Sequence, residues 1–257
     1  MNNDMSYAGR VALVTGSNGV IGSAVVSALR AAGATVVCAD GAATTAWQDA
    51  DDATLASQGV KLDVTDRASI FGLVSRVQDK LSAIDLLVNV AGVVSFGAAH
   101  DLAEAEWDRV IDVNLKGTFM ACQAVIPGMK QLKFGRILNI GSVVGKNAGN
   151  ARPWIDAAEQ QRAGNVAYGV SKAGVHVMTG FLAKELAPHG ITVNAIAPGP
   201  IATPMTTSFP AQLQALIPVG RMGQAQDIVR AALFLADRDA GFITGEVLDV
   251  NGGMLCD

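Results

Sequence analysis

The sequence predicts an α/β fold in which a doubly wound parallel sheet is flanked by helices on both faces. Short apolar runs alternate with helical patterns along the whole chain, which is typical of parallel sheets. The first apolar run is followed at once by a glycine-rich turn and an alanine-rich helix. With 257 residues, half of them hydrophobic, the chain is expected to form a single domain over residues 1–257.

Composition argues against several classes of protein. Lys and Arg total 19 against 23 Asp and Glu, and the absence of a basic block argues against a nucleic-acid partner. The first ten residues resemble no secretion signal, and no stretch of about eighteen apolar residues predicts a membrane span. We therefore expect a cytoplasmic protein without a membrane partner. The three cysteines and three histidines are scattered and predict no metal site.

The first predicted strand, residues 10–15, leads into Gly16-Ser-Asn-Gly19-Val-Ile-Gly22 and a helix that runs to residue 32. Glycines in such a turn allow the backbone to approach a pyrophosphate, which the helix N-terminus attracts. This pattern favours a Rossmann-type nucleotide site. The alternative is a flexible turn at the end of a strand.

The second strand, residues 35–40, ends in a carboxylate. Asp40 follows Gly22 at close to the spacing at which an acid binds the adenosine ribose hydroxyls. It would repel a 2′-phosphate, and neither Ser17, Asn18 nor Gly41 supplies a compensating cation. NAD is therefore favoured over NADP, although Asp40 could also be a simple turn residue.

The middle of the chain continues the alternation. Residues 42–59 are polar and predict a loose, solvated connection or a short helix. Strands are expected at 60–64, 84–89 and 136–142, and helices at 67–81 and 104–129. Taken alone, Asn114 within the long helix suggests a surface or packing residue, and Ser142 is equally compatible with a turn or a ligand site.

Tyr168 and Lys172 lie four residues apart in a predicted helix over residues 166–186, so they share one face. A phenol has a pKa of about 10, and a neighbouring cation would favour its ionised form. The alternative is a half-buried aromatic residue beside a solvated lysine. The preceding loop, residues 146–165, is long and could either cover a pocket or form a surface excursion.

The last part of the chain predicts a strand at 192–197, a turn at Pro198 and Gly199, a helix at 226–236 and a strand at 246–250. Residues 199–220 contain several prolines between apolar residues. This pattern favours an irregular loop or short helices that cover a substrate site.

In order along the chain stand Thr15-Gly16, Gly19, Gly22, Asp40, Asp63-Val64, Asn89-x-Ala-Gly92, Asn114, Ser142, Tyr168-x-x-x-Lys172 and Pro198-Gly-x-Ile-x-Thr203. This set resembles the short-chain dehydrogenase/reductase family over essentially the whole chain. The resemblance implies an NAD-dependent oxidoreductase that interconverts a secondary alcohol and a ketone. It also implies a homotetramer assembled through the Asn114 helix, the Tyr168 helix and the last strand.

The resemblance also implies roles for individual residues. Tyr168 would be the general acid/base, Ser142 would hold the substrate oxygen, and Asn114 would hold a water on the proton path. Lys172 would bind the nicotinamide ribose and lower the pKa of Tyr168. The remaining cofactor contacts would come from Gly16, Asn18, Gly19, Val20, Ile21, Gly22, Asp40, Asp63, Val64, Asn89, Ala91, Gly92, Pro198, Gly199, Ile201 and Thr203. Substrate contacts are expected from Val94, Ser142, Trp154 and Met205.

Three features depart from the family pattern. Val20 stands where the short-form branch has a small residue, and the spacing of Gly16, Gly19 and Gly22 is closer to that of the extended branch. A chain of this length has no room for the added substrate domain of the extended branch, so the resemblance is to the short-form branch. The distance from Ser142 to Tyr168 is longer than usual, and Asn251 replaces an expected aspartate. Two alternative functions stay open: a 3-oxoacyl-thioester (acyl-carrier-protein) reductase, and a nucleotide-sensing protein without catalysis.

Overall fold

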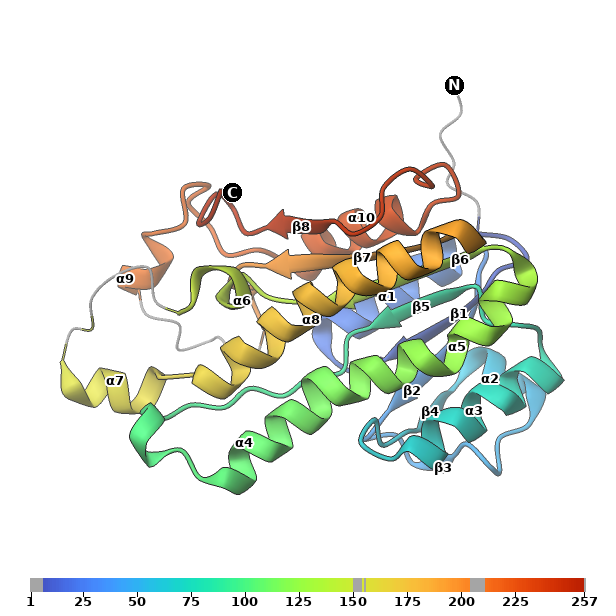
Figure 1. Ribbon diagram of the computed structural model, residues 1–257, viewed down its shortest axis with the longest axis horizontal. Coiled ribbons are helices and arrows are strands. Elements are labelled where there is room, and N and C mark those ends of the chain that lie inside the picture. Colours follow the sequence, from blue (N-terminus) through green and yellow to red (C-terminus); the bar gives the residue numbers. More distant parts are fainter. Residues whose placement is uncertain (1–6, 150–153, 155, 204–210, 257) are drawn as a thin grey trace.

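The computed structural model describes residues 7–149, 154, 156–203 and 211–256. Its strands form one eight-stranded parallel sheet in the order β3-β4-β2-β1-β5-β6-β7-β8 (Figure 1). The strands are β1 (Val11–Thr15), β2 (Thr35–Asp40), β3 (Thr45–Ala46), β4 (Gly59–Lys61), β5 (Leu86–Asn89), β6 (Gly135–Ile140), β7 (Ile191–Pro198) and β8 (Val247–Val250). The order reverses at β1, which places β2 and β5 on its two sides. The predicted Rossmann-type sheet is confirmed.

The helices cover both faces of this sheet (Figure 1). They are α1 (Val20–Ala31), α2 (Asp52–Ser57), α3 (Arg67–Lys80), α4 (Glu104–Ile111), α5 (Thr118–Leu132), α6 (Val144–Asn147), α7 (Ala157–Ala163), α8 (Val166–Leu186), α9 (Ala211–Gln214) and α10 (Ala225–Ala236), with the short turns η1 (Ala99–Asp101) and η3 (Ala187–His189). Between α4 and α5 the backbone forms a π-helical segment, η2 (Asp112–Gly117).

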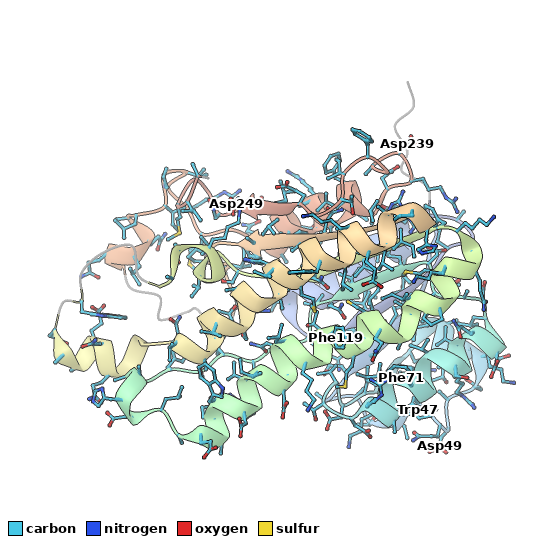
Figure 2. The ribbon with its side chains drawn as sticks, viewed as in Figure 1. Trp47, Asp49, Phe71, Phe119, Asp239 and Asp249 are labelled. Carbon is cyan, nitrogen blue, oxygen red and sulfur yellow. The ribbon has the colours of Figure 1, made fainter. Side chains whose placement is uncertain are left out.

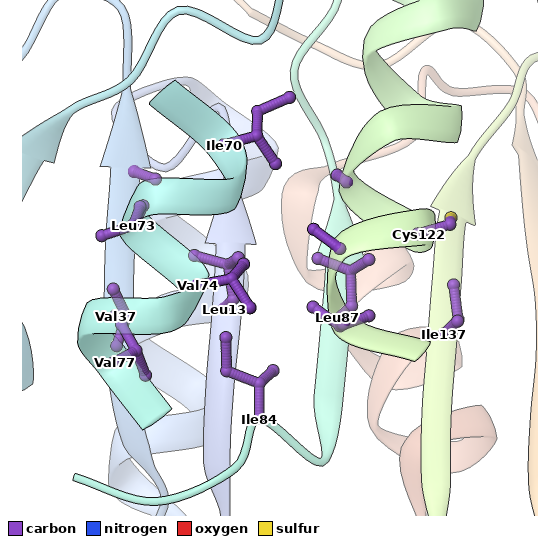
Figure 3. Close-up of a cluster of buried hydrophobic side chains, with 14 of the residues drawn as sticks. Leu13, Val37, Ile70, Leu73, Val74, Val77, Ile84, Leu87, Cys122 and Ile137 are labelled. Carbon is purple, nitrogen blue, oxygen red and sulfur yellow. The ribbon is translucent and has the colours of Figure 1, made fainter. Parts of the chain in front are cut away.

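Two apolar clusters fill the two faces of the sheet. One lies under α3, α5 and α8 and contains Leu13 of β1, whereas the other lies under α1 and α10 and contains Val14. Neighbouring residues of a strand point to opposite faces, which explains why the central strands are continuously apolar. Figure 3 shows the first cluster, where Ile70, Leu73 and Val77 of α3 pack on β1 and β2.

The stretch 42–59 is more ordered than its composition predicts. It contains β3 and α2, and Leu55 of α2 is completely buried. Trp47 lies against α3, where its indole nitrogen donates to the Ser69 hydroxyl at 3.1 Å (Figure 2). Of the two predicted alternatives, the short helix is confirmed by α2 and the solvated connection is wrong. Apolar residues dispersed among charged ones gave no periodic signal, but their burial anchors the segment.

The long helix predicted over residues 104–129 is divided. The π-helical segment interrupts it, and its helical end extends to Leu132. Gly117 at the end of this segment lies against Val64, because a Cβ on Gly117 would lie 2.8 Å from the Val64 carbonyl oxygen. The close approach of Val64 and the extra residue in the turn are tertiary features that hydrophobic periodicity does not encode.

Within the described residues, no helix combines the length and apolar character needed to cross a bilayer. The same residues contain no cluster of three histidine, cysteine or carboxylate side chains suited to a metal ion.

Candidate active site

Helix α8 presents Tyr168 and Lys172 on one face. The Lys172 Nζ lies 5.8 Å from the centroid of the Tyr168 ring, so the predicted neighbourhood of the two side chains is confirmed. Lys172 is only 5% exposed and donates to the Ile140 carbonyl oxygen at 2.7 Å. Burial lowers the pKa of Lys172 to about 8, because the charged ammonium loses its hydration. The alternative of a solvated lysine is excluded.

Ser142 reaches the same place from the sheet. It follows β6 at the carboxyl end of the strand, is buried, and its side chain lies close enough to the Tyr168 phenol to lower the pKa of that phenol. The Val144 N–H donates to the Ser142 Oγ at 3.2 Å, which fixes the serine rotamer. The long insertion therefore does not separate the two hydroxyls. A phenol, a serine hydroxyl and a buried ammonium meet at this edge of the sheet.

The expected effect of Lys172 on Tyr168 is not found. Burial raises the pKa of Tyr168 above its ordinary value, and the neighbouring Ser142 side chain offsets this only in part. The phenolate would lose its hydration in this site, and the Lys172 ammonium is directed to the Ile140 carbonyl oxygen. Lys172 is not among the causes that shift the pKa of Tyr168 here, so its acidifying effect on the phenol stays a prediction.

Asn114 lies at the centre of the π-helical segment and is completely buried. Its Oδ1 accepts from the Val93 N–H at 2.8 Å, and its Nδ2 donates to the Val93 carbonyl oxygen and to the Ser171 Oγ. Of the two roles expected from the residue type alone, the surface position is wrong and the packing role agrees with these contacts. Asn114 therefore connects the backbone that follows β5 with α8, where its partner Ser171 directly precedes Lys172.

Gly92 lies between Asn114 and Lys172. A Cβ at this position would lie 3.3 Å from the Asn114 Oδ1 and 3.4 Å from the Lys172 Nζ. The segment that follows contains Val94, which is half-buried and accepts from the Arg109 guanidinium. The exit of β5 and the catalytic candidates on α8 thus share one edge of the sheet.

The glycine turn after β1 is tightly packed against the exit of β5. Gly16 has a φ of 67°, and a Cβ there would lie 2.6 Å from the Ala91 backbone nitrogen. A Cβ on Gly22 would overlap the Gly16 carbonyl oxygen, whereas Gly19 has extended backbone and more room. Gly16 and Gly22 are therefore required by the fold of the turn, and Gly19 is not.

The turn fits a bound phosphate group. Helix α1 begins at Val20 after Gly19, which supplies no side-chain cap for the N–H groups of Val20, Ile21 and Gly22. The Ser17 Oγ is buried in the same turn without a hydrogen-bond partner. An uncapped helix N-terminus beside an unpaired hydroxyl is suited to an anion.

Asp40 stands beside this turn at the end of β2. Its carboxylate accepts from the Asn18 N–H at 2.9 Å and from the Ala42 N–H at 2.8 Å. No ion pair connects Asp40 with a lysine or arginine in the part of the chain that the structure describes. The carboxylate is thus fixed by backbone groups and carries an uncompensated negative charge.

The remaining predicted cofactor residues lie at the same edge or close to it. Asn89 ends β5, and the Ala91 N–H approaches the Thr15 hydroxyl at 3.4 Å. Asp63 is exposed and accepts from Thr65, while Val64 is half-buried beside η2. Pro198 ends β7, and the Gly199 N–H that follows it donates to the Val250 carbonyl oxygen. Further along the chain, Ile201 is buried and Thr203 is half-buried.

The predicted substrate residues are only partly described. Trp154 is half-buried, whereas Met205 lies outside the described residues. The end of the 146–165 insertion packs beside the Val94 segment, where the Gly97 N–H donates to the Gly164 carbonyl oxygen at 2.7 Å. The insertion also contributes α6 and α7, so it is not a structureless loop.

The end of the 199–220 segment packs against the C-terminal turn. The Val219 N–H donates to the Gly252 carbonyl oxygen at 3.1 Å, and a cavity of about 490 Å³ lies beside this contact. Gly199, Ile217 and Asn251 line it, but Ser142 and Tyr168 do not. The sequence did not predict this cavity.

His176 is a neighbour of the site that the sequence analysis missed. The Ser142 N–H donates to the His176 Nε2 at 3.3 Å. His176 follows Lys172 by four residues and therefore continues the face of α8 that carries Tyr168. The four-residue spacing places His176 on the face of the site, but a lone histidine on a helix is most simply explained by packing.

Comparisons with known proteins agree with this geometry. A family model described as enoyl-(acyl carrier protein) reductase matches residues 16–255. The chain is 41% identical over 256 residues to the (2S)-[(R)-hydroxy(phenyl)methyl]succinyl-CoA dehydrogenase subunit BbsD of Thauera aromatica, covering 97% of this chain and 98% of that protein.

Two further proteins are similar over nearly their whole length. The 3-oxoacyl-[acyl-carrier-protein] reductase FabG of Escherichia coli is 38% identical, with 97% of this chain and 99% of FabG covered. The crystal structure of gox2181 superposes with a TM-score of 0.84 at 34% identity, covering 98% of this chain and 97% of that one. The ordered motifs, the sheet topology and these full-length matches agree, and the chain belongs to the short-chain dehydrogenase/reductase family of oxidoreductases acting on alcohol and ketone groups.

Proposed function

We propose that this oxidoreductase transfers a hydride between NAD(H) and a secondary alcohol or ketone, with Tyr168 as the general acid/base. The proximity of the Ser142 and Tyr168 side chains carries the proposal, because two hydroxyls lie together beside a buried lysine. The nicotinamide cofactor would supply the hydride acceptor or donor, and the protein would supply orientation and proton transfer.

In the proposed mechanism the substrate oxygen lies between the Ser142 Oγ and the Tyr168 Oη. Ser142 donates a hydrogen bond to this oxygen, and Tyr168 gives it a proton in reduction or takes one in oxidation. The raised pKa of Tyr168 keeps the phenol protonated at neutral pH, so the phenol can donate a proton when a ketone is reduced. Oxidation requires an additional positive charge near the phenol.

Lys172 and Asn114 would complete the proton path. Lys172 would exchange its bond to the Ile140 carbonyl oxygen for one to the nicotinamide ribose, and its lowered pKa makes it able to release a proton near pH 8. Asn114 would hold a water behind Lys172, a role supported by their shared neighbour Gly92.

The glycine turn would hold the pyrophosphate, and Asp40 would hold the adenosine ribose. A 2′-phosphate at this position would meet the uncompensated carboxylate of Asp40, which supports NAD over NADP. Among the remaining predicted contacts, Asp63 and Val64 would flank the adenine, and Ile201 with Thr203 would bind the carboxamide.

A second candidate is the reduction of 3-oxoacyl thioesters on an acyl carrier protein, favoured by the similarity to FabG. The two candidates differ in cofactor and substrate. Comparing kcat/KM for NADH and NADPH, first with small ketones and then with 3-oxoacyl thioesters, would separate them. A strong preference for NADPH and the acyl carrier would establish the second candidate.

The substrate site would be formed by Val94, Ser142, Trp154 and Met205, with the 146–165 insertion above it. The hydrogen bond between Gly97 and Gly164 supports this, because it ties the insertion to the segment that carries Val94. Deleting the middle of the insertion should change KM among different alcohols. Unchanged kinetics would indicate a surface excursion.

The decisive experiment replaces Tyr168 with phenylalanine. Turnover should fall at least about a thousandfold, since proton transfer at the substrate oxygen is lost, while NADH binding measured by fluorescence titration stays unchanged. Tyr7 is the other tyrosine of the chain, and its hydroxyl donates to the Leu233 carbonyl oxygen far from Ser142. Tyr7→Phe is therefore the matched control and should keep its kcat.

Retained turnover in Tyr168→Phe would refute the proposal. If the natural chain binds NADH but turns over no alcohol, the alternative of a nucleotide-sensing protein is favoured.

The expected homotetramer and the cytoplasmic location are further parts of this proposal. Support for assembly comes from α8, where Val177 and Phe181 are 62% and 75% exposed. Light scattering tests the assembly, and cell fractionation tests the location.

A further inference from the structure

His176 accepts a hydrogen bond from the Ser142 N–H, which points away from the neighbouring strand. The N–H groups on either side of Ser142 donate to β7 and its end: Gly141 to the Ile196 carbonyl oxygen and Val143 to the Pro198 carbonyl oxygen. The N–H of Ser142 points to the other side, toward α8, and finds the His176 Nε2 at 3.3 Å. Ser142 is 7% exposed, so water does not replace this acceptor easily.

The space around the imidazole is formed by two glycines. A Cβ on Gly141 would overlap the His176 Nε2, and a Cβ on Gly145 would lie 3.0 Å from its Cε1. The ring therefore lies in direct contact with the backbone on both sides of Ser142. Because Nε2 accepts a hydrogen bond, the ring carries its proton on Nδ1.

One rigid element then determines the geometry of both hydroxyls. Tyr168, Lys172 and His176 follow one another at intervals of four residues and so lie along one face of α8. Tyr168 lies close to the Ser142 side chain, and His176 accepts from the Ser142 N–H. Any shift of the strand end relative to α8 would change the distance between the two hydroxyls.

We propose that His176 is a positioning residue for catalysis: its Nε2 binds the Ser142 N–H and so keeps the Ser142 hydroxyl in place beside Tyr168. The proposal rests on the proposed role of the Ser142 and Tyr168 pair. His176 touches neither substrate nor cofactor in it. Its effect is on the rate of the chemical step and not on cofactor binding.

The test compares three substitutions that differ in what they offer the Ser142 N–H. His176→Gln places a carboxamide oxygen near the position of Nε2, His176→Asn is equally polar but too short, and His176→Leu fills space without an acceptor. We expect kcat to fall between about tenfold and a hundredfold in His176→Asn and His176→Leu, because a small misplacement of a reacting group has effects of this size. The kcat of His176→Gln should stay within about threefold of that of the natural chain, and KM for NADH should not change in any variant.

His189→Gln is the control for loss of a histidine on the surface, since His189 is exposed at the end of η3. If His176→Leu does not fold, the Gln and Asn pair still decides the question. Equal kcat values in the Gln and Asn variants, or a natural kcat in His176→Leu, would overturn the proposal.

A second measurement does not depend on turnover. Amide hydrogen exchange by NMR should show a protected Ser142 N–H in the natural chain and in His176→Gln, and faster exchange in His176→Asn. Failure of the proposed function would appear as absent turnover in every form with this protection pattern intact. Failure of the His176 proposal would appear as a Ser142 N–H equally protected in all forms.

Discussion

At the scale of single residues, the site combines groups whose pKa values move in opposite directions. Burial raises the pKa of the Tyr168 phenol and lowers that of the Lys172 ammonium to about 8, so both neutral forms are favoured. In each case the cause is the loss of hydration around the charged form. The protein thus supplies a phenol ready to donate a proton, and a lysine close to releasing one.

The ionisation of Tyr168 can be measured directly. The chain contains two tyrosines, and burial raises the pKa of Tyr7 to about 12. In Tyr7→Phe, absorbance of the phenolate therefore reports Tyr168 alone. The midpoint of its pH titration should lie above the ordinary tyrosine pKa of about 10. Added NAD should lower the midpoint, because the oxidised nicotinamide brings a positive charge. A midpoint below 10 without NAD would contradict the effect of burial, and circular dichroism serves to exclude alkaline unfolding.

The buried charge of Lys172 should destabilise the fold at neutral pH. Its folded-state pKa of about 8 lies below the value of 10.5 in an unhindered chain. The unfolded chain therefore binds more protons between these pH values, and the free energy of unfolding rises with pH through this window. Below about pH 8 the full penalty of about 3 kcal/mol is present.

Lys172→Met should accordingly raise the free energy of unfolding at pH 7 by about 2 kcal/mol, since the lost bond to Ile140 offsets part of the gain. Turnover should disappear. The stability difference should shrink as the pH rises from 8 to 10.5. Urea denaturation at several pH values checks this, with exposed Lys184→Met as the control. A destabilised Lys172→Met at neutral pH would count against the burial penalty.

Residue patterns indicated the pair on α8 but not its surroundings. The interval from Tyr168 to Lys172 predicted a shared face, because helix geometry is local. The burial of Asn114 and the bond from Ser142 to His176 depend on how α8 lies against β6 and η2. Such contacts join distant parts of the chain, and no local pattern in the sequence contains them.

At the scale of elements, the glycine turn shows which glycines serve folding and which serve binding. Gly22 allows α1 to pack on the turn, because a side chain there would overlap the Gly16 carbonyl oxygen. Gly19 has extended backbone and no such overlap. The spacing of glycines at 16, 19 and 22 is therefore compatible with the fold even though Val20 replaces a small residue.

This distinction gives a prediction about two similar substitutions. Gly22→Ala should lower the free energy of unfolding by about 3 kcal/mol, because the backbone of the turn must move. Gly19→Ala should change it by less than about 1 kcal/mol but weaken NADH binding, since its methyl group would approach the pyrophosphate. Thermal denaturation and fluorescence titration measure the two effects. Similar stabilities of both variants would contradict the packing argument.

Element boundaries were predicted well where the pattern was strongly periodic. The strand at 35–40 and the helix at 166–186 agree with β2 and α8 in both bounds. The π-helical segment in the long helix was not predicted, because its cause is the neighbouring Val64 backbone and not the sequence of the helix. Likewise α2 and β3 depend on burial against α3 and β4.

At the scale of the whole molecule, α8 lies beside α4 and η2 (Figure 1). Part of its outer surface is apolar. Within residues 175–182 of α8, Val175 and Leu182 are buried, whereas Val177 and Phe181 are exposed. Exposed apolar residues on a long helix are typical of an interface between subunits. Phe242 near β8 is also fully exposed.

Phe181→Glu should therefore reduce the assembly from a tetramer to a smaller species, because a charge would be buried at the helix pair. Light scattering with size exclusion measures the mass, and Lys80→Glu on exposed α3 serves as the control. If the natural chain already has the mass of one subunit, or if Phe181→Glu stays tetrameric, assembly through α8 is refuted.

The sequence by itself determined the class of fold and the order of the main strands and helices. These follow from local periodicity, which helix and strand geometry convert directly into position. The candidate residues of the active site came from the ordered motifs that resemble the short-chain dehydrogenase/reductase family. Only the tertiary structure decided that the phenol of Tyr168 is made less acidic, that Asn114 is buried, and that His176 holds Ser142. Hydration and contact between distant segments set these properties, and both arise only when the chain has packed.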